Sequence, residues 1–148
     1  MRLWQLNKPE HVPGLDGEGA RLWGGRWNNP GVPAVYCAES LALAALEVLV
    51  NLPEDQRRQD KVPPHVAIAL DVPDGLIDEP GHDVGLPEDV TRRIGDDRLN
   101  NMSNLGLSVP SSVVQLERNI VLNPRHPRMP EVRVALTQTF VFEDRLTY

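Results

Sequence analysis

An almost wholly apolar segment, LALAALEVLV at residues 41–50, carries one carboxylate, Glu47. The pattern predicts a helix over 40–52, with Ser40 as its N-cap and Pro53 stopping it soon after. A helix that is apolar on all sides is buried, so we expect Glu47 to face the interior or a pocket. An ionised carboxylate in such a place needs a partner. Two interpretations remain open, namely an ion pair with an arginine, or an acid, base or electrostatic stabiliser at the floor of a cleft.

A second candidate is the glycine-rich stretch GARLWGGRWNNPG, in which Arg21 and Arg26 bracket Gly24-Gly25. Glycines let the backbone approach a ligand closely, and guanidinium groups bind phosphate in a bidentate way. The spacing differs from that of familiar phosphate loops, so a tight hairpin with solvent-facing arginines is the alternative. Tyr36 follows this stretch, and it could stack on a flat ring while its hydroxyl hydrogen-bonds, or be an ordinary buried tyrosine.

A serine pair, Ser111 and Ser112, follows Pro110. The pair could cap a turn or begin a strand. The sequence contains no G-x-S-x-G elbow and no His/Asp arrangement that would indicate a serine hydrolase. The four histidines lack the spacing of metal ligands, so we predict no metal site.

The composition fits one domain over residues 1–148, with 41% hydrophobic residues. The single cysteine excludes an internal disulfide and suits a reducing compartment. No apolar run approaches the ~20 residues of a membrane span, and no secretory signal is visible. The net charge of −6, without a basic run, disfavours direct binding of nucleic acid. We therefore expect a cytoplasmic protein that binds neither membranes nor nucleic acid.

Strand and helix patterns alternate along the chain, and they predict an α+β fold, a single mixed domain with a central β-sheet flanked by helices. Besides the helix over 40–52, one helix is expected to begin near Pro87-Glu88-Asp89 and another near Gly95-Asp96, running to about Asn101. Strands are expected at 2–6, 34–37, 65–72, 117–122 and 132–142. The last of these, 132–142, is long enough to be a central member of the sheet.

Taken together, residues 19–50 with the preceding Gly17-Glu18, residues 109–127 and residues 140–146 resemble the RES domain, a family named for its Arg, Glu and Ser. The resemblance implies a fold similar to that of ADP-ribosylating toxins, with a cleft for NAD⁺ as substrate and no true cofactor. It also implies a toxin of a toxin–antitoxin pair, whose partner is a cognate antitoxin with an Xre-like helix-turn-helix domain. A homodimer within that complex stays open.

The resemblance also assigns residues. In the GGRWN motif the arginine is Arg26, and the family's tyrosine and glutamate fall on Tyr36 and Glu47. The family's serine is Ser111 or Ser112, and Ser111 is favoured because it directly follows Val-Pro. The residues expected to bind substrate, beyond these, are Arg21 as a second anion contact, Ser112 and Asn119. Relatives often carry an aromatic residue after the I-G-D motif, where this sequence has Asp97-Arg98-Leu99, so the role of Arg98 is open.

These residue types suit NAD⁺ cleavage. Breaking the nicotinamide–ribose bond builds positive charge on the sugar, which the Glu47 carboxylate could stabilise. Arg26 would hold the pyrophosphate, Tyr36 would pack on the nicotinamide, and a serine would hydrogen-bond a ribose or amide. Three hypotheses follow, namely hydrolysis or phosphorolysis of NAD⁺, mono-ADP-ribosylation of a host protein, and non-catalytic nucleotide binding.

Overall fold

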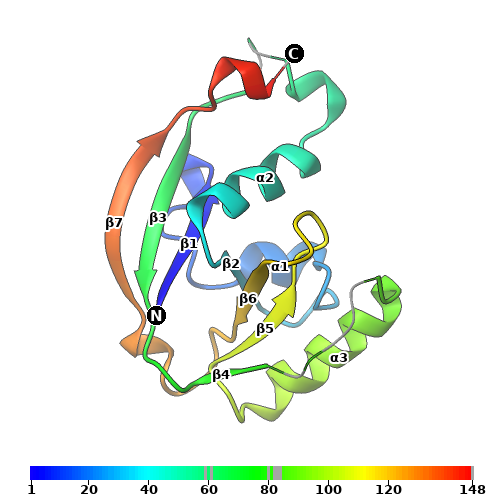
Figure 1. Ribbon diagram of the computed structural model, residues 1–148. Coiled ribbons are helices and arrows are strands. Elements are labelled where there is room, and N and C mark those ends of the chain that lie inside the picture. Colours follow the sequence, from blue (N-terminus) through cyan, green and yellow to red (C-terminus); the bar gives the residue numbers. More distant parts are fainter. Residues whose placement is uncertain (59, 61, 80, 82–84, 148) are drawn as a thin grey trace.

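A curved, seven-stranded sheet organises the computed structural model, which describes residues 1–58, 60, 62–79, 81 and 85–147 (Figure 1). The strand order is β4-β5-β6-β2-β1-β3-β7, and all neighbours are antiparallel except the parallel pair β4–β5. The strands are β1 (Arg2–Asn7), β2 (Val35–Ala38), β3 (His65–Asp71), β4 (Ile77–Asp78), β5 (Gly106–Pro110), β6 (Arg118–Leu122) and β7 (Arg133–Phe140). Together with the helices, this sheet confirms the expected α+β class.

The helices lie against different parts of this sheet. The longer ones are α2 (Leu41–Asn51), which packs against β1 and β2, and α3 (Glu88–Asn101), which contacts β5. A shorter helix, α1 (Glu18–Trp23), precedes β2. Single 3₁₀ turns lie at Pro9–His11, Glu54–Gln56, Met129–Glu131 and Asp144–Leu146.

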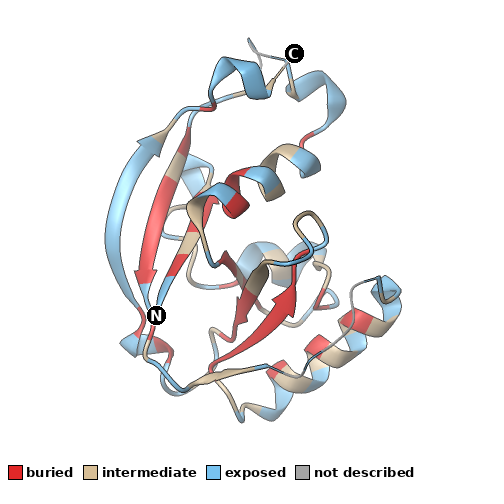
Figure 2. Cartoon of the chain, viewed as in Figure 1, coloured by how far each residue is buried: buried red, intermediate tan, exposed pale blue. Residues whose placement is uncertain are grey.

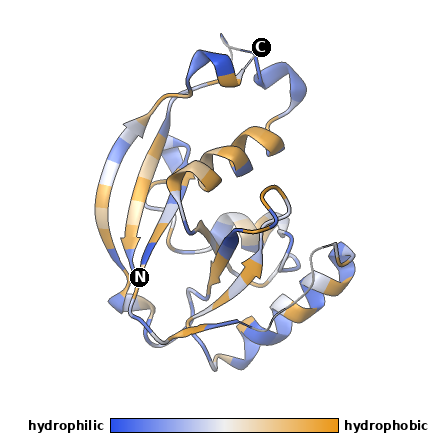
Figure 3. Ribbon diagram, viewed as in Figure 1, coloured by the Kyte–Doolittle hydropathy of each residue, from blue (hydrophilic) through white to orange (hydrophobic). Residues whose placement is uncertain are grey.

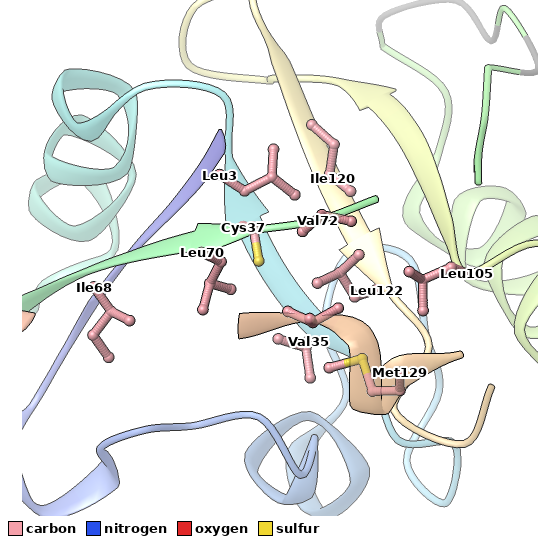
Figure 4. Close-up of a cluster of buried hydrophobic side chains, with 11 residues drawn as sticks. Leu3, Val35, Cys37, Ile68, Leu70, Val72, Leu105, Ile120, Leu122 and Met129 are labelled. Carbon is pink, nitrogen blue, oxygen red and sulfur yellow. The ribbon is translucent and has the colours of Figure 1, made fainter. Parts of the chain in front are cut away.

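The largest cluster of buried side chains lies on one face of the central strands (Figure 4). Successive side chains of a strand point to opposite faces, so residues two apart share a face. Val35 and Cys37 of β2 therefore enter the cluster together, as do Ile120 and Leu122 of β6. Burying each such aliphatic side chain stabilises the fold by roughly 1.5–3 kcal/mol.

Most of the predicted elements are confirmed. The strands expected at 2–6, 34–37, 65–72 and 117–122 are present as β1, β2, β3 and β6. The helix expected over 40–52 is α2, and its N-cap is Ser40, whose Oγ accepts a hydrogen bond from the Leu43 amide at 3.1 Å. The bond satisfies one of the amides that the first helical turn leaves without a partner.

The expectation that α2 is buried on all sides was wrong. Leu43, Ala44 and Ala45 are buried, but Leu46 and Val50 are exposed. Figure 3 shows α2 as mostly apolar over its length, and Figure 2 shows exposed segments on the same helix. The sheet packs against one side of the helix, so some of the apolar side chains of α2 remain exposed.

The long last strand is an edge strand, which corrects the prediction that it is central. Strand β7 pairs only with β3 at the end of the order, and seven of its eight residues are exposed (Figure 2). Val134 and Leu136 remain more than 40% exposed. The prediction rested on the length of the strand, and length does not determine the order of strands in a sheet.

A helix does begin where one was expected, near 87–89, but it continues to Asn101 as α3, so the second helix expected from about 95 is part of it. Gly95 was expected near the start of the second helix, yet it is an interior residue of α3 at a point of close packing. A Cβ at Gly95 would lie 1.7 Å from the Trp27 carbonyl oxygen. The glycine therefore allows the helix to approach the backbone around Trp27 rather than ending the helix. Helix α1 and strands β4 and β5 were not predicted.

Candidate active site

A cavity of about 710 Å³ opens between α2, the turn after α1 and the first turns of α3. Its wall also includes residues of β1 and β2 and of the segment that joins β5 to β6. This volume lies in the range of small-molecule and cofactor pockets, roughly 300–1,000 Å³. The polar side chains that matter most for its chemistry are Arg26, Tyr36, Glu47, Arg92, Ser112 and Asn119. The cavity thus brings together residues from distant parts of the chain.

Glu47 lies on the cavity side of α2 and is half-buried. Its Oε1 accepts hydrogen bonds from Ser111 Oγ at 2.8 Å and from Asn119 Nδ2 at 2.7 Å. Within the described part of the chain, Glu47 forms no ion pair with an arginine, and its Oε2 has no hydrogen-bond partner. Neutral donors therefore fix one carboxylate oxygen, while the other can accept hydrogen bonds from a ligand.

The two serines lie in different environments. Ser111 is fully buried, and its Oγ accepts hydrogen bonds from the amides of Val113 and Val114, both at 3.0 Å. With both acceptor positions occupied, its single proton goes to Glu47. Ser112 is exposed and lines the cavity. Ser111 is thus placed to orient the carboxylate, and Ser112 is placed to contact a ligand.

Tyr36 contributes its ring to the cavity wall but uses its hydroxyl inside the protein. The hydroxyl accepts a hydrogen bond from the Trp27 amide at 2.9 Å and donates one to Asn28 Oδ1 at 2.7 Å. Burial raises the pKa of this phenol above its ordinary value, against the smaller opposing effect of the Trp27 amide. A Cβ at Gly25 would lie 2.6 Å from the hydroxyl, so a larger residue there would have to displace the tyrosine side chain.

Residues 24–28 form a tight turn with a bridge between Gly25 and Asn28. The fully buried Asn28 holds the turn, because its Nδ2 donates to the Ala20 and Val32 carbonyls at 2.9 Å each. Arg26 lies within the turn, lines the cavity, and donates from Nη2 to the Leu86 carbonyl at 3.4 Å. A tight turn was one of the predicted alternatives, but its arginine faces the cavity and not only solvent.

Arg21 is not brought to this site. It is exposed on α1, pairs with Glu18 at 2.7 Å and does not line the cavity, so its position gives no support to the predicted anion contact. Arg92 of α3 lies on the cavity wall instead. No sequence signal marked Arg92, because it occurs in a polar helix far from the glycine-rich motif. Asn28 was also missed, although it belongs to that motif and could have been noticed there.

Arg98 lies outside the cavity. It forms an ion pair with Asp78, which joins α3 to β4.

In the described part of the chain no three His, Cys, Asp or Glu side chains form a metal-binding group. The described helices are also too short or too polar to cross a membrane.

The fold and the cavity define a small α+β protein with a polar pocket of nucleotide size. The RES domain family model matches residues 2–143, and the chain belongs to that family. The chain is 37% identical over 132 residues to a protein of Photorhabdus laumondii named "Toxin Res", covering 84% of this chain and 82% of the relative. A "Toxin Res" of Yersinia enterocolitica is 34% identical over 138 residues, 88% of each chain.

Two further comparisons extend these findings. A Sphingobium protein named "Prs ADP-ribosylating toxin" is 30% identical over 142 residues, covering 89% of this chain and 86% of the relative. Among solved structures, a chain in the crystal structure of the M. tuberculosis MbcT–MbcA toxin–antitoxin complex superposes with a TM-score of 0.72. The match covers 94% of this chain and 83% of that chain at 19% identity, so it shows a shared fold.

Proposed function

We propose that this protein is the toxin of a bacterial toxin–antitoxin pair and that it cleaves the nicotinamide–ribose bond of NAD⁺, by hydrolysis or phosphorolysis. The observation that carries the proposal is Glu47, a carboxylate with one oxygen fixed by two donors and the other available in a nucleotide-sized cavity. The names of the relatives from Photorhabdus and Yersinia support the toxin role.

In the proposed reaction, the bond between the nicotinamide nitrogen and the ribose C1′ breaks, and its electron pair stays on nicotinamide. Positive charge builds on the ribose as this bond lengthens. Glu47 Oε2 accepts hydrogen bonds from the ribose hydroxyls and stabilises that charge by a few kcal/mol. A water or phosphate oxygen then bonds to C1′, and a water that attacks releases its proton to solvent. Nicotinamide leaves as a neutral molecule, so no general acid is needed.

Other cavity residues bind the substrate in this proposal. The Arg26 guanidinium holds the pyrophosphate, since planar guanidinium groups bind phosphate oxygens in pairs. The Tyr36 ring packs on the nicotinamide, while Ser112 donates a hydrogen bond to a ribose or amide oxygen. Asn119 and Ser111 hold Glu47 in place. No metal or true cofactor takes part in the proposed reaction.

The direct test is to incubate purified protein with NAD⁺, with and without phosphate, and to quantify nicotinamide, ADP-ribose and phosphorylated ADP-ribose. We expect nicotinamide release, and a Glu47→Gln variant of nearly the same size should lose roughly 10²–10³-fold in kcat. Wild-type protein that binds NAD⁺ but releases no nicotinamide would indicate the non-catalytic hypothesis. Full activity in Glu47→Gln would remove Glu47 from the mechanism.

Mono-ADP-ribosylation of a host protein is the second candidate, favoured by the Sphingobium relative named "Prs ADP-ribosylating toxin". The same bond breaks, but a nucleophilic side chain of the target takes the place of water or phosphate at C1′. Mass spectrometry of cell lysate incubated with enzyme and NAD⁺ separates the two candidates. A protein gaining one ADP-ribose supports the transferase, and free ADP-ribose or its phosphorylated form supports NAD⁺ degradation.

We also propose a cytoplasmic antitoxin partner with an Xre-like helix-turn-helix domain. The fold match to a chain from a toxin–antitoxin complex supports such a partner. Co-expression with the product of a short neighbouring gene should relieve growth arrest and yield a stable complex. The mass of that complex in solution will also test a homodimer of the toxin within it.

A further inference from the structure

We propose that Arg92 provides the second cation contact for the substrate diphosphate, the role expected of Arg21, and that Glu88 is its internal counter-ion. This inference rests on the proposed use of the cavity as an NAD⁺ site. A diphosphate carries two negative charges at neutral pH. Arg26 and Arg92 are the arginines among the described residues that line the cavity.

Arg92 is held at the cavity by two directional contacts. Its Nε donates to the Gly25 carbonyl at 2.8 Å, and its Nη2 lies 2.9 Å from Glu88 Oε1. The side chain is 28% exposed, against 43% for Arg21. The bond to Gly25 fixes the guanidinium on the turn that carries Arg26, whatever the position of Glu88. A fixed guanidinium loses little conformational entropy when it binds a ligand.

The start of α3 and the turn at residues 24–28 form one connected unit. Thr91 Oγ1 donates to the Arg26 carbonyl at 2.5 Å, next to the bond between Arg92 and Gly25. One turn further along the helix, Gly95 packs against the Trp27 backbone. These contacts hold the backbone of Arg26 and the side chain of Arg92 on one unit, and both residues line the cavity. Two guanidinium groups carried on one rigid unit suit the two phosphates of one diphosphate better than a single flexible cation does.

Glu88 is the group that a bound diphosphate would displace from Arg92. Its side chain is 56% exposed, and its pair with Arg92 has the i,i+4 spacing on a helix surface. Pairs of this kind are weak in water. An anionic ligand can thus replace the carboxylate at small cost. Removing the Glu88 charge should tighten diphosphate binding by roughly two-fold, since a competing counter-ion is lost.

The test is calorimetric titration of the full chain with ADP-ribose, which contains the diphosphate but no bond to cleave. Arg92→Gln should bind ADP-ribose about 10- to 100-fold more weakly than wild type, the range expected for losing charged hydrogen bonds. Arg92→Lys, which keeps the charge but not the planar fork, should lie between the two. The matched control is Arg21→Gln, which removes an arginine paired with a glutamate three residues before it, outside the cavity.

The results separate this inference from the proposed function. If wild-type protein binds neither ADP-ribose nor NAD⁺, the proposed function fails and this inference fails with it. If wild type binds and Arg92→Gln binds equally well, or Arg21→Gln loses as much, only the assignment to Arg92 is overturned. Thermal unfolding verifies that each variant folds. If Arg92→Gln does not fold, the Glu88→Gln variant provides the test. It should bind ADP-ribose more tightly than wild type, and unchanged or weaker binding would contradict the counter-ion role of Glu88.

Discussion

The buried Ser111 Oγ donates a hydrogen bond to Glu47 Oε1 at 2.8 Å, which joins the segment after β5 to the cavity side of α2. The same Oγ accepts from the amides of Val113 and Val114, so the direction of the bond to Glu47 is fixed. A carboxylate held at Oε1 in this way leaves Oε2 available to a ligand in the cavity that Glu47 lines. Preorganisation of that kind is a large part of electrostatic catalysis.

From this geometry we predict that Ser111→Ala lowers kcat for nicotinamide release by up to about 10²-fold, because the Glu47 carboxylate loses its fixed orientation. Its KM for NAD⁺ should change much less, since Ser111 is buried and is not among the residues that line the cavity. Steady-state kinetics with purified protein measure both quantities. Ser112→Ala is the matched variant, and it should instead raise KM, about 2- to 10-fold for one lost hydrogen bond. A raised KM in Ser111→Ala with a lowered kcat in Ser112→Ala would contradict these separate roles of the two serines.

The two helical glycines of α1 and α3 give a paired prediction on stability. Gly95→Ala should destabilise the protein by about 3 kcal/mol or more, because its Cβ would lie 1.7 Å from the Trp27 carbonyl oxygen. Gly19→Ala, with nothing within 4 Å of its Cβ, should stabilise by roughly 0.5–1 kcal/mol through reduced backbone entropy of the unfolded chain. Urea unfolding of both variants measures the free energies. Equal effects would mean that α3 does not approach the turn this closely.

Gly95 also illustrates which features the sequence could predict. Local patterns were sufficient for β1, β2, β3, β6 and α2, because periodicity and capping residues act over a few positions. The close contact of Gly95 with Trp27 and the edge position of β7 are tertiary features, so the local pattern predicted two helices in place of α3 and a central last strand. Local hydropathy carries no information about either.

The residues of the candidate site also fall into two groups, those that the sequence indicated and those that it did not. Glu47 was identifiable because a single carboxylate interrupts an apolar helix, and the family resemblance supplied Arg26, Tyr36 and the serine pair. Arg92 could not be identified, because only the packing of α3 against residues 24–28 brings it to the cavity. The different environments of Ser111 and Ser112 depend on the path of the backbone after β5, and the spacing of residues in the sequence does not determine that path.

For Tyr36 we predict that the ring and the hydroxyl have separable effects. Tyr36→Phe should lower the free energy of unfolding by about 1–3 kcal/mol, because the buried Asn28 Oδ1 loses its donor and the Trp27 amide loses its acceptor. Its KM for NAD⁺ should stay within a few-fold of wild type, since the ring remains on the cavity wall. Tyr36→Ala, which removes the ring as well, should raise KM strongly. Unfolding curves and steady-state kinetics on both variants test this, and equal KM values would exclude a ring contact.

The buried thiol of Cys37 gives a prediction on pH dependence. Burial raises the pKa of Cys37 from 9.0 to about 12. The unfolded chain therefore releases the thiol proton near pH 9, while the folded protein retains it, so ionisation favours the unfolded state as the pH rises. The contribution of Cys37 to stability is fully present below pH 9 and is lost between about pH 9 and pH 12.

The measurement is the free energy of unfolding from urea titrations between pH 8 and pH 11 for wild type and Cys37→Ala. Wild type should lose stability more steeply above pH 9, by up to about 1.4 kcal/mol per pH unit relative to the variant. Tyr36, whose pKa is also raised by burial, contributes equally to both proteins and cancels in the difference. The variant starts less stable at pH 8 because the core cluster loses a side chain, and the two curves should converge as the pH rises. Parallel curves would contradict the prediction, because they would mean that the thiol ionises as readily in the folded protein, where it is buried on β2 between β1 and β6, as in the unfolded chain.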